Sequence, residues 1–330
     1  MAELKIFRET DVDKNILADL CIAVIGYGAQ GSAQALNMRD SGLNVIIGGR
    51  PGKSFAAAEA AGFAVFSVAE AVKKADVIHI LLPDEHQGSI FKADILPHLT
   101  AGQILSFSHG FSVVYKEIVA PEGVDIIMVA PKGVATEVRN RYVAGSGVPG
   151  LISARSGGKR CFDIALAMAH GMGLTRSGVM ECTMEQETVQ DLFGEQNILC
   201  GGMIDLMISA FEVLTEAGYP PQMAYIECIQ EAKLLIDLIY AKGFKETNRV
   251  ISNTAEWGEY VNGPRLITPE VKAQMRESLR RIENGDFARE WLAEVKNGAP
   301  NLLAKREAIG NHPVEAAGAA VREIFQKNSK

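Results

Sequence analysis

Two pairs of carboxylates have a spacing that could serve metal chemistry. Asp191 and Glu195 are four residues apart, and so are Glu227 and Glu231. On a helix, residues four apart project from one face, one turn from each other. Like charges at that spacing repel, and a buried carboxylate needs a counter-charge. We therefore expect a cation among these side chains.

The neighbouring residues are apolar, so we expect these faces to be buried. Met184 and Ile198 flank the first pair at helical spacing, and Leu234 and Leu238 continue the second. No matching set of His or Cys accompanies the carboxylates, and hard oxygen ligands favour Mg²⁺ or Mn²⁺ over zinc. The sequence predicts a divalent-metal site, with a solvated acidic face as the alternative.

A glycine-rich turn follows an apolar segment near the N-terminus. The stretch CIAVIGYGAQG places Gly26, Gly28 and Gly31 in the spacing GxGxxG, after a predicted strand and before a predicted helix. In that context the glycines allow a tight turn, close approach of a pyrophosphate to the backbone, and packing of the helix on the strand. We predict a dinucleotide site over residues 26–31.

The loop after the next predicted strand bears on the choice of cofactor. An NAD-binding protein usually has an acidic residue there for the ribose hydroxyls. This chain has Arg50, Lys53 and Ser54, with no carboxylate between them. Two cations and a hydroxyl suit a 2′-phosphate, so the loop favours NADP over NAD. An exposed basic turn is the alternative.

Polar residues follow three further predicted strands. The run Asp84–Gln87 follows DVIHILLP, His109 follows QILSFS, and Lys132 follows VDIIMVAP. Ligands bind at the carboxyl ends of the strands in a doubly wound sheet, so these residues are functional candidates. His79 lies inside an apolar strand, and we interpret it as a core residue.

The elements that position these residues fall into two domains. Strand and helix patterns alternate up to residue 182, which predicts a Rossmann-type α/β domain over residues 1–182 with a parallel doubly wound sheet. Residues 1–20 should cover one sheet edge with a short helix and a strand. Residues 183–330 predict an all-helical domain for metal binding and dimerisation, to which the family resemblance given below adds substrate binding. Some of its helices are apolar all round, so we expect an intimate dimer to bury them.

Composition narrows the function classes. The 330 residues carry a formal net charge of −7 with no basic run, which argues against nucleic acid and anionic membranes as partners. We find no apolar run that approaches a membrane span, and the charged start lacks the apolar core of a signal peptide. The five cysteines lack CxxC spacing, so we expect reduced core residues of a cytoplasmic protein.

Long motifs along nearly the whole chain resemble the ketol-acid reductoisomerase (acetohydroxyacid isomeroreductase) family. In order they are GYGAQGSAQALNMRDSG, ADVIHILLPDEHQ, SHGF, MVAPKG, ETVQDLFGEQNILCGG, EAGYPPQMAYIECIQEAKLLIDLIY, ISNTAEWGEYVNGPR and FAREW. The length is similar to that of the short, class I form, which has one copy of the helical domain. The resemblance implies a knotted helical domain and a homodimer whose subunits share each active site. Higher assembly stays open.

The resemblance also implies roles for the carboxylates. Asp191 would bridge two Mg²⁺ ions, and Glu195 would bind one of them. Glu227 and Glu231 would come from the other subunit, and Ser252 would bind the substrate near its carboxylate, beside Glu231.

Other roles follow from the same resemblance. His109 would be the active-site histidine and Lys132 part of the polar network. The general base stays open between His109 and a metal-bound water steered by Lys132 and Glu231. The implied contacts to NADPH are Gly26, Tyr27, Gly28, Ala29, Gln30, Gly31, Arg50, Lys53, Ser54, Asp84, Glu85, His86, Gln87, Gly133 and Ala135.

The implied reaction gives the carboxylates a use. The family's substrates are 2-acetolactate and 2-aceto-2-hydroxybutyrate. Two Mg²⁺ ions would promote migration of a methyl or ethyl group, and NADPH would then reduce the product to a 2,3-dihydroxy acid, in valine and isoleucine biosynthesis. NADH stays open as the hydride donor. The alternatives are a metal-independent β-hydroxyacid or imine-type dehydrogenase and a non-catalytic dinucleotide-sensing dimer, and neither uses four carboxylates.

The chain departs from the family pattern in three places. After APKG, residues Val134, Ala135 and Thr136 replace the usual Pro-Gly-His, so a backbone contact to the nicotinamide end through that glycine does not carry over. The loop with Lys53 is one residue shorter than usual, which keeps its cationic character but weakens the preference for NADP. Ser32 replaces a common histidine.

Overall fold

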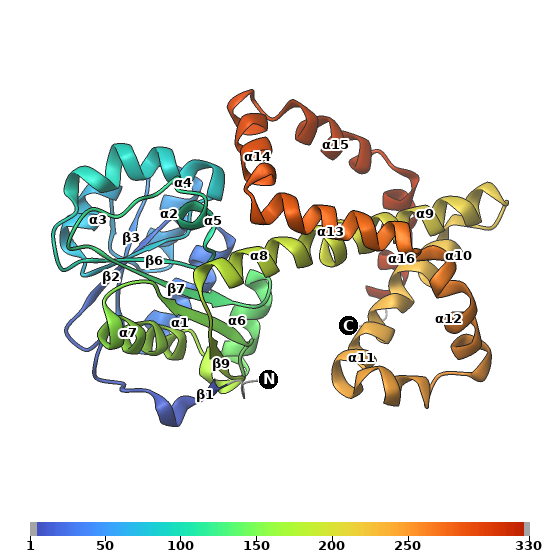
Figure 1. Cartoon of the computed structure of the whole chain (residues 1–330), viewed down its shortest axis with the longest axis horizontal. Helices are drawn as coiled ribbons and strands as arrows, with labels where there is room; N and C mark the ends of the chain where they lie inside the picture. Colours follow the sequence, from blue (N-terminus) through green and yellow to red (C-terminus); the bar gives the residue numbers. More distant parts are fainter. Residues whose placement is uncertain (1–4, 327–330) are drawn as a thin grey trace. The chain divides into compact units, whose positions relative to one another are not determined.

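The structure is a computed structural model that describes residues 5–326. It contains two compact units, Met1–Gln190 and Asp191–Lys330, which we call the N-terminal unit and the C-terminal unit (Figure 1). The boundary between them falls within one helix, α8 (Met184–Gly194). Both expected fold types are confirmed, a Rossmann-type α/β unit followed by a helical unit.

The N-terminal unit is built on a sheet whose order, within the described residues, is β1-β9-β8-β7-β6-β5-β2-β3-β4. The strands are β1 (Ile6–Phe7), β2 (Cys21–Ile25), β3 (Asn44–Gly48), β4 (Val65–Phe66), β5 (Val77–Ile80), β6 (Ile104–Phe107), β7 (Asp125–Pro131), β8 (Gly150–Ala154) and β9 (Val179–Glu181). As expected, the N-terminal residues cover one edge, because β1 pairs with β9.

The predicted parallel pairing holds for the strands from β2 to β7, but the sheet as a whole is mixed. The pairs β7–β8 and β1–β9 are antiparallel, whereas the strands from β2 to β7 pair in parallel. The chain leaves β7 at Pro131 and re-enters the sheet opposite that residue at Gly150. A strand covered on both faces reads as an apolar run whichever way it points, so the sequence pattern could not show this reversal.

Helices cover both faces of the sheet. The helices α1, α6 and α7 lie on one face, and α3, α4 and α5 lie on the other (Figure 1). The helical elements of this unit are η1 (Glu9–Asp11), α1 (Ala29–Asp40), α2 (Lys53–Ala60), α3 (Val68–Lys74), α4 (Asp84–Ile90), η2 (Phe91–Ile95), η3 (Leu96–His98), α5 (Phe111–Val114), α6 (Ala135–Val143), α7 (Gly158–Gly171) and η4 (Leu174–Arg176). Successive residues of β2 therefore enter different cores: Ile22 and Val24 one, Ala23 and Ile25 the other.

The strand order reverses between β2 and β5. From β2 the chain continues through β3 and β4 on one side, and it returns to β5, β6 and β7 on the other. Ligands of doubly wound sheets bind outside the carboxyl ends of the strands at such a point. The glycine turn after β2 and the polar residues after β5, β6 and β7 all emerge at this edge.

The C-terminal unit is helical throughout its described residues. Beyond α8 the elements are η5 (Glu195–Leu199), α9 (Gly202–Glu216), α10 (Pro221–Tyr225), η6 (Ile226–Gln230), α11 (Glu231–Asn248), α12 (Asn253–Leu266), α13 (Pro269–Glu283), α14 (Asp286–Lys296), α15 (Pro300–Gly310) and α16 (Pro313–Gln326). A small core forms where α9, α10 and α16 meet, with Phe211, Ala224, Val314 and Ala317.

A π-helical segment adjoins each carboxylate pair. In η5 the N–H of Cys200 donates to the carbonyl of Glu195 at 2.8 Å, five residues back, and in η6 the N–H of Glu231 donates to the carbonyl of Ile226. Isolated π turns are rare in proteins, and those that occur are often found at functional sites. The spacing of the carboxylates predicts a helix correctly, but it does not reveal this local widening.

The prediction that these helix faces are buried is wrong for one chain. Met184 is buried, but Leu234 is 65% exposed and Ile198 is 53% exposed. The C-terminal unit has too few helices to surround each apolar helix on all sides. Among the cysteines expected in the core, Cys161 is buried, whereas Cys200 is exposed.

One helical run also corrects the statement about membrane spans. Met184–Glu216, through α8, η5 and α9, is long and apolar enough to cross a membrane by length and composition, with a mean hydropathy of 1.7 in its most apolar window. Length and composition equally suit a helix covered by another protein chain. The run also carries Asp191, Glu195 and Asp205, which would be costly in lipid.

Candidate active site

In the turn after β2, the three glycines of the motif have different surroundings. Gly26 has φ of +101°, a conformation that favours glycine, and a Cβ there would lie 3.0 Å from the carbonyl oxygen of Leu81. A Cβ on Gly31 would lie 2.1 Å from the carbonyl oxygen of Gly26, so α1 packs on this turn only with glycine. Gly28, the N-cap of α1, faces open space. This geometry fits a pyrophosphate at the helix N-terminus.

The loop after β3 places positive charge at the start of α2. Arg50, Lys53 and Ser54 are exposed, and Lys53 is the first residue of the helix. The first turn of α2 contains no acidic residue. Backbone N–H groups and cationic side chains together suit a phosphate group.

The run Asp84–Gln87 forms the first turn of α4 at the carboxyl end of β5. Gln87 is buried, and its amide nitrogen donates to the carbonyl of Leu82 at 2.8 Å and to Oδ1 of Asp84 at 3.0 Å. Through these two bonds, Gln87 stabilises the conformation of the loop between β5 and α4. Glu85 and His86 occupy the outer part of the same turn.

His109 and Lys132 meet at a carboxylate that was not among the predicted site residues. The side chain of Glu187, on α8, is 1% exposed, and its Oε1 accepts a hydrogen bond from Nζ of Lys132 at 2.5 Å. Its Oε2 lies 3.1 Å from Nδ1 of His109 and accepts from the N–H of Gly110 at 3.3 Å. The structure thus brings two of the three predicted catalytic residues together in the N-terminal unit.

The charge state of Glu187 follows from its neighbours. Burial raises the pKa of its carboxyl group, but the hydrogen bond from His109 and the charges of His109 and Lys132 outweigh burial and lower the pKa overall. The carboxylate is therefore ionised at neutral pH and holds both side chains in place. Glycine at position 110 permits this approach, since a Cβ there would lie 2.2 Å from Oγ1 of Thr188.

The spacing of acidic residues could have identified Glu187. It precedes Asp191 by four residues, as Asp191 precedes Glu195. Three carboxylates therefore follow one another on one face of the helical run from α8 into η5. Extending the pattern by one turn toward the N-terminus would have added Glu187 to the predicted site.

The four predicted metal ligands lie at the π-helical segments. Asp191 is half-buried on α8, whereas Glu195, Glu227 and Glu231 are exposed. Among the described residues of the C-terminal unit, no three of these carboxylates offer oxygens within 4.8 Å of one another. One chain alone therefore does not bring the two pairs together. As a donor set, the oxygens along α8 and η5 are of the kind that Mg²⁺ prefers.

Ser252 is the N-cap of α12. Its Oγ accepts a hydrogen bond from the N–H of Ala255 at 3.1 Å, and the residue is exposed. Capping uses the oxygen as an acceptor, so the hydroxyl hydrogen can still be donated to a ligand.

Comparison with known families covers both units. The model of the acetohydroxy acid isomeroreductase NADPH-binding domain matches residues 16–178, and that of the ketol-acid reductoisomerase C-terminal domain matches residues 184–327.

Two curated relatives are similar over nearly their full length. A ketol-acid reductoisomerase (NADP(+)) from Akkermansia muciniphila is 61% identical over 328 residues, 98% of this chain and 100% of that protein. A ketol-acid reductoisomerase (NAD(+)) from the uncultured archaeon GZfos26G2 is 52% identical over 331 residues, 98% of this chain and 99% of that protein.

A solved structure agrees with the sequence relatives. The NADH-preferring ketol-acid reductoisomerase from an uncultured archaeon superposes with a TM-score of 0.94 at 51% identity, over 98% of this chain and 99% of that one. Motifs, both family models, full-length relatives and fold therefore agree, and the chain belongs to the ketol-acid reductoisomerase family, in its short, class I form.

Proposed function

We propose that this protein converts 2-acetolactate and 2-aceto-2-hydroxybutyrate into 2,3-dihydroxy acids, by alkyl migration followed by reduction, in valine and isoleucine biosynthesis. The proposal rests on the carboxylates of α8. The buried Glu187 contacts both His109 and Lys132, and Asp191 follows Glu187 by one helical turn. A metal-independent dehydrogenase has no use for such a series.

Asp191 and Glu195 are the proposed ligands of two Mg²⁺ ions, with Glu227 and Glu231 contributed by a partner subunit. When bound, the ions supply positive charge that lowers the pKa of the substrate hydroxyl and polarises the adjacent ketone, which favours alkyl migration. The hard oxygen donors at successive helical turns support this assignment. Ser252 is proposed to donate its hydroxyl hydrogen to the substrate, near the carboxylate of the substrate. Glu231 is proposed to bind the substrate as well.

Glu187, Lys132 and His109 act as one hydrogen-bonded group in this proposal. Nζ of Lys132 donates to Oε1 of Glu187 at 2.5 Å, which fixes a positive charge in one place. His109 bonds to the same carboxylate through Nδ1, which sets the orientation of its ring. We propose His109 as a candidate for the base that deprotonates the substrate. Substitution of His109 would test that role.

NADPH is the proposed hydride donor, with NADH as the alternative. Arg50, Lys53 and Ser54 at the start of α2 support a 2′-phosphate. The relatives are divided, since one is named for NADP(+) and another for NAD(+). The other proposed cofactor contacts are residues 26–31, residues 84–87, Gly133 and Ala135.

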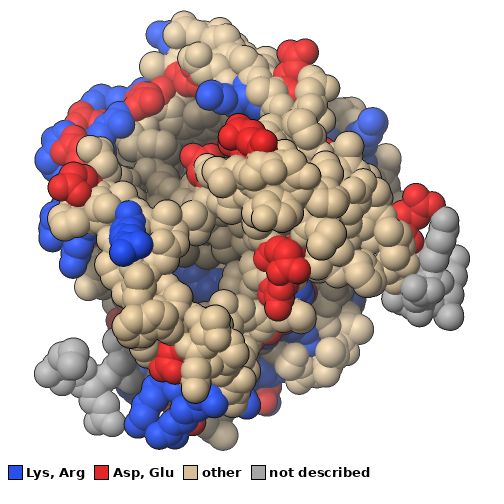
Figure 2. Space-filling model, turned by 90° about the vertical axis from the view of Figure 1, so that its right-hand side faces the viewer, with Lys and Arg blue, Asp and Glu red and all other residues tan. Residues whose placement is uncertain are grey.

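A homodimer with shared active sites is the proposed assembly. Large apolar side chains of the C-terminal unit are exposed in one chain, including Tyr240 at 76%, Phe244 at 73% and Trp257 at 69%. Figure 2, viewed from the side on which α9 to α12 lie in Figure 1, shows broad areas of uncharged side chains between scattered charged ones. A second chain would cover these side chains. The knot and a cytoplasmic location remain predictions.

The test is oxidation of NADPH by the purified protein with 2-acetolactate. We expect turnover with Mg²⁺, none with EDTA, and slower turnover with NADH. Asp191→Asn should abolish turnover, whereas Asp205→Asn, an exposed carboxylate on α9, should not. Turnover that persists in EDTA, or NADPH binding without turnover in Mg²⁺, would contradict the proposal.

A further inference from the structure

A chain of hydrogen bonds runs from the surface loop at Gly133, through the glycine turn after β2, into the buried core of the N-terminal unit. Nε2 of Gln30, in the first turn of α1, donates to the carbonyl of Gly133 at 3.0 Å. Nε2 of Gln34 donates to Oε1 of Gln30 at 3.0 Å. Oε1 of Gln34 lies 2.9 Å from Nε2 of His79, and Nδ1 of His79 lies 2.9 Å from Oγ of Ser106. The side chains of Gln34, His79 and Ser106 are fully buried.

The carbonyl at one end fixes the direction of every bond in this chain. Because the Gly133 carbonyl only accepts, Gln30 must use its N–H, which leaves its oxygen to accept from Gln34. Gln34 then presents its own oxygen to His79, so Nε2 of His79 must carry the hydrogen. Burial lowers the pKa of His79 to about 4, so the ring is neutral and Nδ1 accepts from the Ser106 hydroxyl.

The bond between Gln30 and Gly133, at one end of the chain, lies where a dinucleotide would bind. Gln30 belongs to the glycine turn after β2, at the point where the strand order reverses. Gly133 follows β7, on the side of that point away from β3 and its basic loop. In a doubly wound fold the adenosine half lies toward β3 and the other half toward the opposite strands, so Gly133 borders the nicotinamide half.

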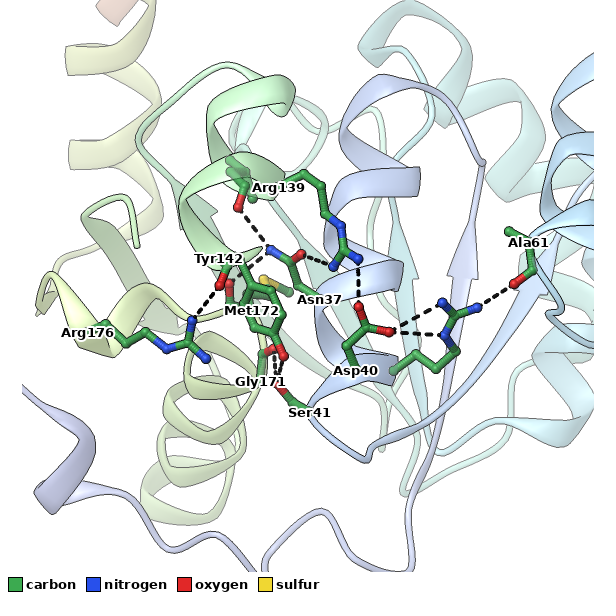
Figure 3. A network of polar contacts seen from close by, with 11 residues as sticks. Asn37, Asp40, Ser41, Ala61, Arg139, Tyr142, Gly171, Met172 and Arg176 are labelled. Carbon is green, nitrogen blue, oxygen red and sulfur yellow. Dashed lines mark hydrogen bonds and ion pairs between the residues drawn. The ribbon is translucent and has the colours of Figure 1, made fainter. Parts of the chain in front are cut away.

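A second group of contacts holds α1 against α6, the helix that follows the Gly133 loop (Figure 3). Nδ2 of Asn37 on α1 donates to the carbonyl of Val138 on α6 at 3.1 Å and to that of Met172 at 3.2 Å. Arg139 on α6 donates to Oδ1 of Asn37 at 2.9 Å and to Oδ2 of Asp40 at 2.6 Å. With α6 fixed by these contacts, the Gln30–Gly133 bond determines where the intervening loop lies.

We propose that Gln34 and His79 are positioning residues for the cofactor: through Gln30 they hold the Gly133 carbonyl and the glycine turn at a fixed separation, which sets how the nicotinamide half is seated. This inference rests on the proposed cofactor-binding function of the N-terminal unit. Neither residue needs to touch the cofactor, because Gln30 and Gly133 carry the effect.

The test compares two buried glutamines of the N-terminal unit. Gln34→Met removes the middle of the chain at nearly constant volume. Gln103→Met is the control, because Gln103 is buried and donates to the carbonyls of Val72 and Ala75 at 2.7 Å, at the opposite end of the strands. Both variants should lose stability by losing buried hydrogen bonds. The dissociation constants of NADPH and NADH are then measured by fluorescence on the full-length protein.

We expect Gln34→Met to weaken binding of both cofactors about tenfold and Gln103→Met to leave binding within about twofold. His79→Leu should behave like Gln34→Met. His79→Gln, whose amide N–H can replace Nε2–H, should restore binding. Equal cofactor affinities in Gln34→Met and Gln103→Met would overturn the proposal. Because binding is measured without substrate, failure of wild-type turnover would contradict the proposed reaction and not this inference.

Discussion

The two units differ in how completely each buries its own apolar side chains. In the N-terminal unit, both faces of the sheet are covered, and strand residues such as Ile22 and Ile78 are fully buried. In the C-terminal unit, the shared core of α9, α10 and α16 is small, while Leu234 and Trp257 are more than 60% exposed. The first unit is complete as one chain. The second leaves large apolar side chains uncovered within one chain, which is why we propose that a second copy covers them.

The contrast extends to the polar residues of the proposed site. In the N-terminal unit, His109, Lys132 and Glu187 are joined by direct contacts within one chain. In the C-terminal unit, Glu195, Glu227 and Glu231 are exposed, and Asp191 is half-buried. We infer that cofactor binding belongs to the N-terminal unit alone, whereas metal binding depends on assembly.

The largest expected effect comes from placing charge on the exposed apolar surface of α11. Leu234→Asp should prevent dimer formation, because a partner would have to bury an unpaired carboxylate, and turnover should fall below detection. Binding of NADPH to the N-terminal unit should survive. Sedimentation gives the assembly state and fluorescence gives NADPH binding.

The control is Val119→Asp in the N-terminal unit, where the valine is 67% exposed. This variant should assemble and turn over like the wild type. A Leu234→Asp protein that stays dimeric and active would remove the distinction between the two units.

The next effect concerns Glu187. Glu187→Gln removes the buried negative charge that Lys132 and His109 contact, which should cost about 3 kcal/mol in the free energy of unfolding and lower turnover at least about 100-fold. Glu185→Gln, two residues away on α8, breaks an exposed ion pair with Arg155 and should cost less than about 1 kcal/mol. Urea denaturation and steady-state kinetics measure both. Similar costs for the two variants would mean that Glu187 has no special role.

The contribution of His79 to the free energy of unfolding should depend on pH. Burial lowers its pKa to about 4 in the folded protein from an ordinary value of 6.5, so the unfolded chain takes up the proton first as the pH falls. Its contribution to stability is complete above pH 6.5 and is lost between pH 6.5 and 4, by about 2 to 3 kcal/mol at pH 4.5. His79→Gln should remove that part of the acid sensitivity. Urea denaturation at pH 7.5 and 4.5 measures it, and an unchanged difference between the two pH values would contradict it.

The smallest effect tests the cofactor loop. Arg50→Ala should weaken NADPH binding about tenfold by removing a charge-assisted contact to the 2′-phosphate, and it should leave NADH binding within about twofold. Lys92→Ala, an exposed cation on η2, is the control and should change neither. The same ratio should appear in the Leu234→Asp background if selectivity belongs to the N-terminal unit. Equal losses for both cofactors would show that Arg50 contacts something other than the 2′-phosphate.

The sequence by itself determined the local features of this protein. The GxGxxG turn could be predicted because Gly26 and Gly31 meet backbone carbonyls that leave no room for a Cβ. The apolar strands and helices could be predicted because their periodicity reflects burial on neighbouring elements. The carboxylate pairs could be placed on helices for the same reason.

Tertiary structure decided what depends on contacts between distant residues. The direction of β8 was not in the sequence, because a strand buried on both faces has the same pattern either way. Glu187 became part of the site only when α8 brought it to His109 and Lys132, 78 and 55 residues away along the chain. Likewise, His79 could be assigned to the core, but its place between Gln34 and Ser106 required the packing of α1 on β5 and β6. Spacing along a chain determines which face a side chain shares, whereas the partner it meets depends on how separate elements pack.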